Sequence, residues 1–243
     1  MLKTVIFDMD GVIIDSEAQH AKASLNTFKE LGVDTDLDYC KSFTGSSSKK
    51  MAETAIKDFS LDITTNALLD KLNLAKKKLH EKEGYIPVEG VDALIKRLYK
   101  DGVQLAIASS SSPKEIETVV KKLGIKKYFE KLVSASSVAN PKPSPDTFLL
   151  ALEKLGAAPE DTVIIEDSTF GVKAAKAANV ACIGFINPNS GNQNLNDADV
   201  LIESFDGIDK TFIENTLLRS QGKPLTIAST KRLFIRELAV SDI

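Results

Sequence analysis

Hydrophobic residues follow two different patterns along this chain of 243 residues. Between residues 18 and 83, apolar side chains recur every three or four positions, which is typical of amphipathic helices. From Tyr85 onward, helical patterns alternate with short, almost continuously apolar runs that suit strands buried on both faces, and therefore predict a parallel sheet. The predicted strands of this part span residues 103–108, 131–134, 162–165 and 181–185, and the predicted helices begin near residues 91, 113, 145 and 170.

An apolar strand at residues 3–7 precedes the helical stretch and belongs to the same predicted sheet. We therefore expect an α/β fold, with a Rossmann-like parallel sheet core, helices on both faces and an inserted all-helical cap domain. The expected catalytic core comprises residues 1–14 and 86–215, the helical cap residues 15–85, and a C-terminal tail residues 216–243. A helical domain inserted at the carboxyl end of a strand would lie over the crevice there as a lid that excludes water and selects substrate.

Composition narrows the class of function. The chain carries a net charge of −3, contains 43% hydrophobic residues and has no run of 18 apolar residues, so we expect a soluble protein without membrane spans. Its first residues lead into a strand that ends in acids instead of a cleavage site of small residues, which favours the cytoplasm. Arginines are not clustered, so no nucleic acid partner is expected, and Cys40 and Cys182 fit free thiols better than a disulfide or a zinc site.

Two acids follow the first strand, in the segment Asp8-Met9-Asp10-Gly11-Val12. Ligands of α/β sheets bind in the crevice at the carboxyl ends of the strands. A turn that begins at Gly11 can let both side chains reach this crevice although they are only two residues apart. One acid could then attack a substrate while the other transfers a proton.

Polar residues also follow later strands of the predicted sheet. Ser109 begins a run of four serines, whose hydroxyls and amides can hold an anion ahead of a helix. Lys142 stands between two prolines, which stiffen the backbone and direct one flexible cation. Glu166 and Asp167 follow the strand at residues 162–165. We expect these groups to meet at one edge of the sheet.

Each segment alone also has a structural interpretation. The Asp-x-Asp-Gly segment could be a turn or a calcium-type loop, the serines and Glu166-Asp167 could cap helices, and Lys142 could be a solvated lysine. Together they favour phosphoryl transfer, because several carboxylates would repel a phosphate unless a hard cation lay between them. Oxygen ligands suit Mg²⁺, and the lysine and serine would balance the phosphoryl oxygens.

The four segments resemble, in order, the four motifs of the haloacid dehalogenase superfamily, and the resemblance spans residues 3 to about 210. The helical insertion, Asp15-Ser16-Glu17 and the Lys-Pro-Ser-Pro-Asp segment at residues 142–146 are similar to the branch that contains beta-phosphoglucomutase and many sugar-phosphate phosphatases. Dehalogenase activity is disfavoured, because members with that activity lack the second aspartate that Asp10 supplies here.

The resemblance implies a role for each motif residue. Asp8 would be the nucleophile that forms an aspartyl-phosphate, and Asp10 would protonate the leaving oxygen and later activate water. Mg²⁺ would be held by Asp8, the backbone carbonyl of Asp10 and Asp167, with Glu166 joining it or orienting a bound water. The groups implied for phosphoryl binding are Ser109, Lys142 and the backbone amides of Met9, Asp10 and Ser110.

The resemblance leaves the fate of the phosphoryl group open. His20 stands where beta-phosphoglucomutase carries a histidine, although a partly buried helix histidine is the structural alternative. The mutase has an arginine after a glycine in the cap, whereas here Lys49 offers a cation one place later than expected after Gly45. The segment at residues 111–113 is also similar to the phosphatases. We therefore expect a phosphohydrolase for a small phosphorylated metabolite, such as a sugar or polyol phosphate, with the mutase as the alternative and a non-catalytic binding module as a third hypothesis.

The tail has a separate pattern. Residues 230–242 alternate apolar and charged side chains, as a half-exposed strand does. They lie outside the haloacid dehalogenase resemblance and resemble the first strand of an N-acetyltransferase domain, which implies a bifunctional protein with a missing C-terminal acetyltransferase domain. The alternative is an extra edge strand or a partner-binding arm, and an unpaired strand could associate with a neighbouring chain.

Overall fold

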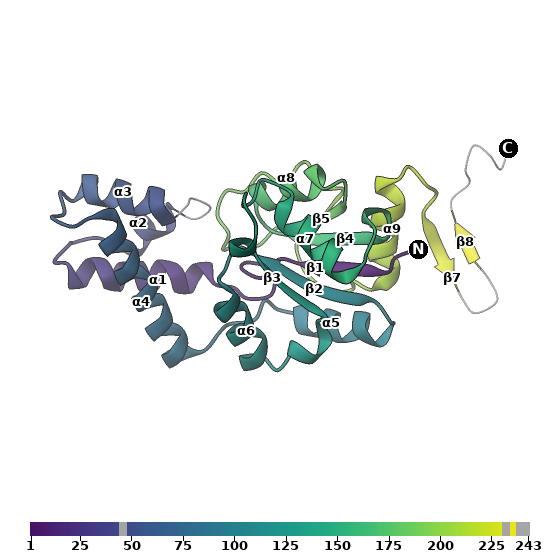
Figure 1. Cartoon of the computed structure of the whole chain (residues 1–243), viewed down its shortest axis with the longest axis horizontal. Coiled ribbons are helices and arrows are strands. Elements are labelled where there is room, and N and C mark those ends of the chain that lie inside the picture. The colour runs from purple at the N-terminus through teal and green to yellow at the C-terminus, as the bar shows by residue number, and fades with distance from the viewer. Residues whose placement is uncertain (44–47, 230–233, 237–243) are drawn as a thin grey trace.

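A six-stranded sheet forms the centre of the molecule in this computed structural model, which describes residues 1–43, 48–229 and 234–236 (Figure 1). All neighbouring strands are parallel, in the order β3-β2-β1-β4-β5-β6. The strands are β1 (Thr4–Phe7), β2 (Gln104–Ser109), β3 (Lys131–Ser134), β4 (Thr162–Glu166), β5 (Ala181–Phe185) and β6 (Val200–Ile202). The predicted parallel sheet and its first five strands are confirmed, whereas β6 was not predicted.

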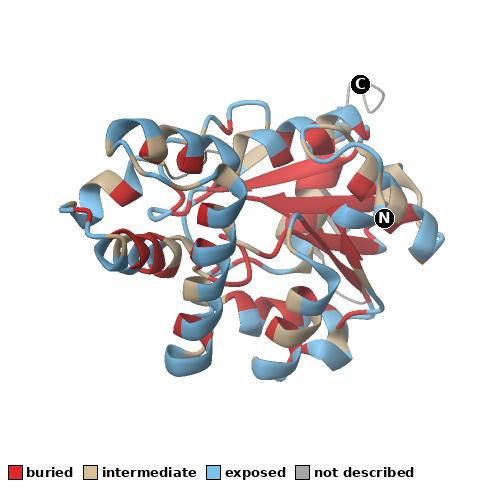
Figure 2. Ribbon diagram, turned by 60° about the vertical axis from the view of Figure 1, so that its left-hand side comes forward, coloured by how far each residue is buried: buried red, intermediate tan, exposed pale blue. Residues whose placement is uncertain are grey.

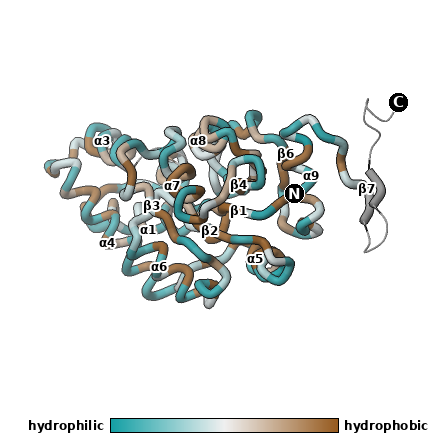
Figure 3. Tube along the Cα trace, turned by 45° about the vertical axis from the view of Figure 1, so that its right-hand side comes forward, coloured by the Kyte–Doolittle hydropathy of each residue, from teal (hydrophilic) through white to brown (hydrophobic). Residues whose placement is uncertain are grey.

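Both faces of the sheet are buried (Figure 2). Along β1, Val5 and Phe7 join one hydrophobic cluster and Ile6 joins another, because successive side chains of a strand point to opposite faces. This double burial explains why the strands are almost continuously apolar in the sequence. In Figure 3 the hydrophobic strands are enclosed by helices that carry hydrophilic residues on their outer turns.

Helices cover the sheet on both faces, as expected. On one face α5 (Val91–Lys100), α6 (Pro113–Lys122) and α9 (Lys210–Ser220) pack against the cluster of Val5 and Phe7. On the other face α7 (Asp146–Leu155) and α8 (Thr169–Ala177) pack against the cluster of Ile6. The 3₁₀ helices are η1 (Lys126–Tyr128), η2 (Ala135–Ser137) and η3 (Pro159–Asp161). Helix α9 was not predicted.

Four helices form the insertion between β1 and β2: α1 (Glu17–Glu30), α2 (Leu37–Lys41), α3 (Ser48–Asp58) and α4 (Thr65–Glu83). They lie at one end of the molecule and have their own hydrophobic core, which includes Phe28, Leu68 and Leu72 (Figure 1). Over its described residues the insertion is helical, as expected, whereas its boundaries at residues 15 and 85 and its role as a cap remain predictions. Gly45, Ser46 and Ser47, used above to compare the cap loop with that of the mutase, lie outside the described residues.

Two linkers join the insertion to the sheet domain and run side by side. The amide of Asp15 donates to the carbonyl of Ile86 at 2.8 Å, and the amide of Val88 donates to the carbonyl of Ile13 at 3.0 Å. The side chain of Gln19 on α1 also donates to the carbonyl of Gly84, just after α4, at 3.0 Å. Any movement of the insertion relative to the sheet must therefore bend two linkers that are hydrogen-bonded to each other.

Part of the tail is a strand. Residues 234–236 form β8 (Phe234–Arg236), which pairs antiparallel with β7 (Thr226–Ser229) of the same chain. The hairpin lies at the end of the molecule opposite the insertion (Figure 1). The other residues of the predicted strand, 230–233 and 237–242, lie outside the described residues, and the acetyltransferase domain stays a prediction.

The two cysteines and the lengths of the helices bear on the expectations from composition. Cys40 and Cys182 are free and buried, as expected for isolated thiols. None of the helices in the described ranges is both long enough and apolar enough to cross a membrane.

Candidate active site

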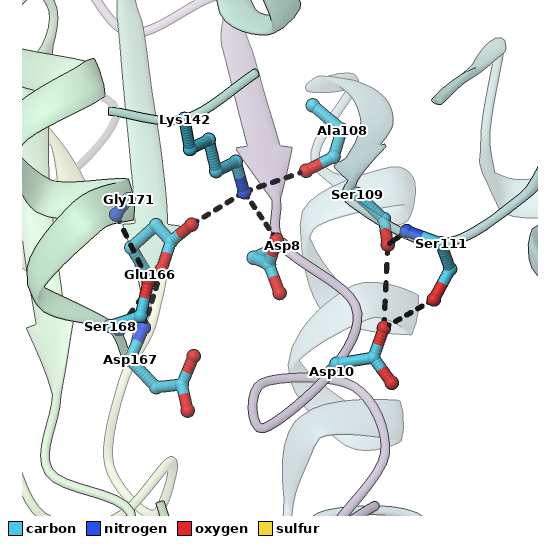
Figure 4. A network of polar contacts seen from close by, with 10 residues as sticks. All are labelled: Asp8, Asp10, Ala108, Ser109, Ser111, Lys142, Glu166, Asp167, Ser168 and Gly171. Carbon is cyan, nitrogen blue, oxygen red and sulfur yellow. Dashed lines mark hydrogen bonds and ion pairs between the residues drawn. The ribbon is translucent and has the colours of Figure 1, made fainter. Parts of the chain in front are cut away.

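The carboxyl ends of three adjacent strands meet at the centre of the sheet. Strand β1 pairs with β2 on one side and with β4 on the other, so the strand order reverses at this point. Crevices for ligands form at such a reversal. Asp8 directly follows β1, Ser109 ends β2 and Glu166 ends β4, with Asp167 next to it. The structure therefore brings these predicted residues to one edge, as Figure 4 shows.

Lys142 joins two of the acids. Its ammonium nitrogen donates to a carboxylate oxygen of Asp8, to Glu166 Oε1 at 2.6 Å and to the carbonyl of Ala108 at 3.2 Å. The side chain is only 6% exposed. Burial lowers the pKa of Lys142, but the carboxylates of Asp8 and Glu166 outweigh burial and raise its pKa overall. The lysine is therefore a fixed, permanently charged cation at the centre of the site.

Asp8, Glu166 and Asp167 form a buried acid cluster, in which one oxygen from each carboxylate lies within 4.8 Å of the others. Burial raises the pKa of Asp8 to about 8, against the lowering effect of Lys142. Burial, followed by Glu166 and Asp8, raises the pKa of Asp167 well above its ordinary value. When all three acids are ionised, three negative charges face one positive charge, and two negative charges remain uncompensated. A divalent cation with oxygen ligands fits this donor set.

Glu166 is held rigidly. Its Oε2 accepts hydrogen bonds from the amides of Asp167 and Ser168 and from the Ser168 hydroxyl, each at 3.0 Å. Residue 171 must be glycine, since a Cβ there would lie 1.8 Å from the Glu166 carboxyl carbon. With Lys142 on its other oxygen, Glu166 has little freedom to rotate. It can orient a neighbouring ligand as well as bind one.

The side chain of Asp10 turns away from Asp8 and toward two serines (Figure 4). Its Oδ2 accepts from Ser111 Oγ at 2.7 Å and from Ser109 Oγ at 3.4 Å. The amide of Ser111 donates in turn to Ser109 Oγ at 3.0 Å. The two aspartates that the turn was expected to bring to one crevice thus have different hydrogen-bond partners. This separation suits two different chemical roles.

The other predicted residues have distinct surroundings. The side chain of Met9 is fully buried, whereas Ser110, directly after β2, is exposed. His20 on α1 lies with its ring centroid 6.1 Å from that of His80 on α4. Lys49 is exposed and forms an ion pair of 3.8 Å with Glu53, one turn along α3. The structure thus groups His20 with a second histidine and pairs Lys49 within its own helix.

Sequence reasoning missed Ser111, as a partner of Asp10, and the whole loop after β5. In that loop the side-chain amide of Asn187 donates to the carbonyl of Gly11 at 2.8 Å, and the hydroxyl of Ser190 donates to Asp167 Oδ2. A signal for this loop was present. Asn187 and Ser190 follow the apolar run at residues 181–185, as the other site residues follow their strands.

Comparisons with known proteins agree with this architecture. The family "haloacid dehalogenase-like hydrolase" matches residues 5–185. The fructose-1-phosphate phosphatase YqaB of Escherichia coli is 31% identical over 180 residues, which are 74% of this chain and 94% of that protein. The beta-phosphoglucomutase of Bacillus subtilis is 28% identical over 75% of this chain and 83% of that protein.

A solved structure agrees as well. The crystal structure of CbbY from Rhodobacter sphaeroides in complex with phosphate has a TM-score of 0.75 and 26% identity, and it covers 88% of this chain and 100% of that chain. The resemblance found in the four motifs is thereby confirmed. This chain belongs to the haloacid dehalogenase-like hydrolases, in the branch of sugar-phosphate phosphatases and beta-phosphoglucomutase, and it is an enzyme of the phosphatase type.

Proposed function

We propose that this enzyme is a Mg²⁺-dependent phosphohydrolase that acts on a small phosphorylated metabolite, a sugar or polyol phosphate, through an aspartyl-phosphate on Asp8. One observation carries the proposal: a buried acid cluster lies against a single buried lysine at the carboxyl ends of β1 and β4. The activity that names the Escherichia coli relative, on fructose 1-phosphate, supports the substrate class.

The donor set supports a magnesium site. Asp8 and Asp167 would supply carboxylate oxygens, the backbone of Asp10 a carbonyl oxygen, and Glu166 would bind directly or orient a bound water. Mg²⁺ would supply charge neutralisation for the carboxylates and for the phosphoryl oxygens. Two uncompensated negative charges in a buried cluster are the physical reason to expect a divalent ion here.

Different residues would act in the two halves of the reaction. In the first half, an Asp8 oxygen bonds to phosphorus while the bond from phosphorus to the substrate oxygen breaks, and Asp10 gives its proton to that oxygen. In the second half, Asp10 takes a proton from water as the water oxygen bonds to phosphorus, and the bond to Asp8 breaks to release phosphate. Lys142, Ser109 and the amides of Met9, Asp10 and Ser110 would hold the phosphoryl oxygens throughout.

The helical insertion would act as a cap, with residues 15–85 as one unit and residues 1–14 and 86–215 as the catalytic core. Its separate hydrophobic core supports movement as one body, and its paired linkers support movement about a single hinge. Closure would exclude bulk water while the substrate is bound and would bring residues of α1 and α4 over the substrate.

The proposal is tested by replacing the nucleophile. We expect Asp8→Asn to fold and to lose roughly 10³-fold or more of the turnover of an aryl phosphate, because the remaining groups cannot form the covalent intermediate. Asp92→Asn is the matched control, since Asp92 is an exposed residue of α5 that pairs with Lys96, and it should keep wild-type activity. Near-native turnover by Asp8→Asn would contradict the proposal.

A mutase is the second candidate, favoured by one feature of the insertion. The rings of His20 on α1 and His80 on α4 are tilted against each other at 6.1 Å between centroids, and His80 is buried with its Nε2 unpartnered. Such groups could bind a sugar hydroxyl that receives the phosphoryl group. Incubation with beta-glucose 1-phosphate and a trace of the 1,6-bisphosphate separates the candidates. We expect free phosphate from a panel of sugar and polyol phosphates, whereas rapid formation of glucose 6-phosphate would favour the mutase.

A further inference from the structure

The loop after β5 contains two buried polar residues that contact the acid cluster or the turn beside it. Asn187 is 6% exposed and Ser190 is 4% exposed. Buried polar side chains are costly unless they are hydrogen-bonded. Both are: Asn187 donates to the carbonyl of Gly11 at 2.8 Å, and Ser190 donates to Asp167 Oδ2. The loop therefore links the turn after β1 to the acid after β4.

Asp167 is enclosed from two sides at this point. A Cβ on Gly11 would lie 1.9 Å from Asp167 Oδ2, so the carboxylate packs directly against the glycine backbone. The Ser190 hydroxyl contacts the same oxygen. Asn187 holds the carbonyl of Gly11, so the turn cannot withdraw from Asp167 without breaking that bond.

Hydrogen bonds to its backbone also hold Ser190 in place. Its carbonyl accepts from the Gln193 side chain at 2.9 Å, and the oxygen of the same Gln193 amide accepts from the amide of Thr169 at 2.9 Å. Thr169 is the first residue of α8, only two residues after Asp167. The Ser190 backbone is thus tied through Gln193 to the first residue of α8, close in sequence to Asp167.

We propose that Asn187 and Ser190 are positioning residues that hold Asp167 against the Gly11 turn and thereby set the affinity and selectivity of the acid cluster for its divalent cation. The inference rests on the proposed function, because it takes the cluster to be a cation site. Ser190 occupies one lone pair of Oδ2, which favours binding of the cation through Oδ1 of Asp167 alone. One oxygen per carboxylate suits Mg²⁺, whereas Ca²⁺ also accepts carboxylates through both oxygens in more flexible sites.

The test measures cation binding to the full chain by calorimetry, with MgCl₂ and CaCl₂ in separate titrations at one pH. We expect Ser190→Ala to weaken Mg²⁺ binding by roughly 10- to 100-fold. Removal of a side chain that hydrogen-bonds to a metal ligand typically has an effect of this size. Calcium binding should weaken less, because the released Asp167 can use both oxygens, so discrimination between the two ions should fall. Ser190→Thr keeps the hydroxyl and should restore binding close to that of the wild type.

Two further variants complete the set. Ser220→Ala removes a hydroxyl that bonds the carbonyl of Leu217 at the end of α9, and it should leave Mg²⁺ binding unchanged. Asn187→Ser shortens the side chain that holds Gly11, and it should weaken Mg²⁺ binding in the same direction as Ser190→Ala. If Ser190→Ala does not fold, Mg²⁺ binding by Asn187→Ser tests the positioning role of the loop.

The outcomes separate this inference from the proposed function. If the wild type binds Mg²⁺, Asp167→Asn loses it and Ser190→Ala binds as tightly as the wild type, the positioning role is wrong and the phosphohydrolase site stands. Equal losses in Ser190→Ala and Ser190→Thr would also contradict a role of the hydroxyl. If the wild type itself binds no Mg²⁺, the proposed function fails first.

Discussion

At the scale of single residues, the site is built on a charge imbalance. Asp8, Glu166 and Asp167 are buried together, and Lys142 compensates only part of their charge. Buried carboxylates that lack full compensation hold protons more tightly, which is the direction seen for the pKa values of Asp8 and Asp167. A bound cation would therefore compete with protons for the same oxygens, and we expect the stability of the cation-free enzyme to depend on pH.

The sign of this pH dependence follows from Asp8. Its pKa rises from an ordinary 3.8 to about 8, so between these values the folded enzyme binds a proton that the unfolded chain releases. Stability contributed by that proton is complete below the ordinary pKa and is lost as the pH rises through about 8. In EDTA, the melting temperature of the wild type relative to Asp8→Asn should fall between pH 5 and pH 9, a window of roughly four units that brackets the raised pKa.

The control for this prediction is the same titration with saturating Mg²⁺. Bound Mg²⁺ would displace the protons, so the difference between wild type and Asp8→Asn should no longer fall with rising pH. A difference that is flat in EDTA would show that Asp8 keeps its ordinary pKa in the folded enzyme.

At the scale of elements, the turn after β1 packs directly against the acid cluster. Gly11 has φ +85°, a left-handed conformation that favours glycine, and its backbone touches Asp167. Gly32, after α1, has φ +76°, but a Cβ at this residue would meet no atom within 4 Å. Gly32 therefore shares the conformational requirement of Gly11 without its close contact.

Alanine substitutions at the two glycines separate the cost of the backbone conformation from the cost of the contact with Asp167. Gly32→Ala should lower the free energy of unfolding by about 1–2 kcal/mol, the cost of placing an alanine in that conformation, and should keep activity. Gly11→Ala should add a collision with Asp167 to a similar cost and should lose Mg²⁺ binding and turnover. Chemical denaturation and calorimetry on both variants check the prediction, and wild-type Mg²⁺ affinity in Gly11→Ala would contradict it.

Hydrophobic periodicity predicted the elements that are apolar on both faces or along one stripe. It missed β6, which has only three residues and is partly exposed, and α9, which follows it. Parallel pairing then brought Asp8, Ser109 and Glu166 to one edge, because the carboxyl ends of parallel strands share an edge. The hydrogen-bond partners of the site residues were harder to predict from the sequence. Ser190 reaches Asp167 only because the loop after β5 turns back to the residues that follow β4, a tertiary arrangement with no local period.

At the scale of the whole molecule, the enzyme combines a sheet domain with a separately packed helical insertion. Each has its own hydrophobic core, and the paired linkers connect them. The acid cluster lies in the sheet domain, whereas His20 and His80 lie in the insertion. Under the proposed function, chemistry and substrate selection would be carried by different parts, and damage to the connection should affect them unequally.

A substitution at Gln19 tests whether the connection between the two parts affects substrate binding separately from metal binding. Gln19→Ala removes the bond to Gly84 across the two ends of the insertion, and it should cost about 1 kcal/mol of stability and raise KM for sugar phosphates. Mg²⁺ affinity should not change. Gln221→Ala, which removes an exposed bond to the carbonyl of Glu160, is the matched control and should leave KM unchanged. A Gln19→Ala enzyme with wild-type KM would argue against a cap that acts through these linkers.

The most direct test of the account is detection of the phosphate that Asp8 is proposed to carry. Asp10→Asn should slow hydrolysis of the intermediate, while an aryl phosphate, whose leaving group needs no proton, should still transfer its phosphoryl group. After an acid quench, mass spectrometry of the digested protein is expected to find phosphate on the peptide that contains Asp8, and none when Asp8→Asn is added. Turnover with no phosphorylated peptide, or with phosphate on another residue, would contradict the account.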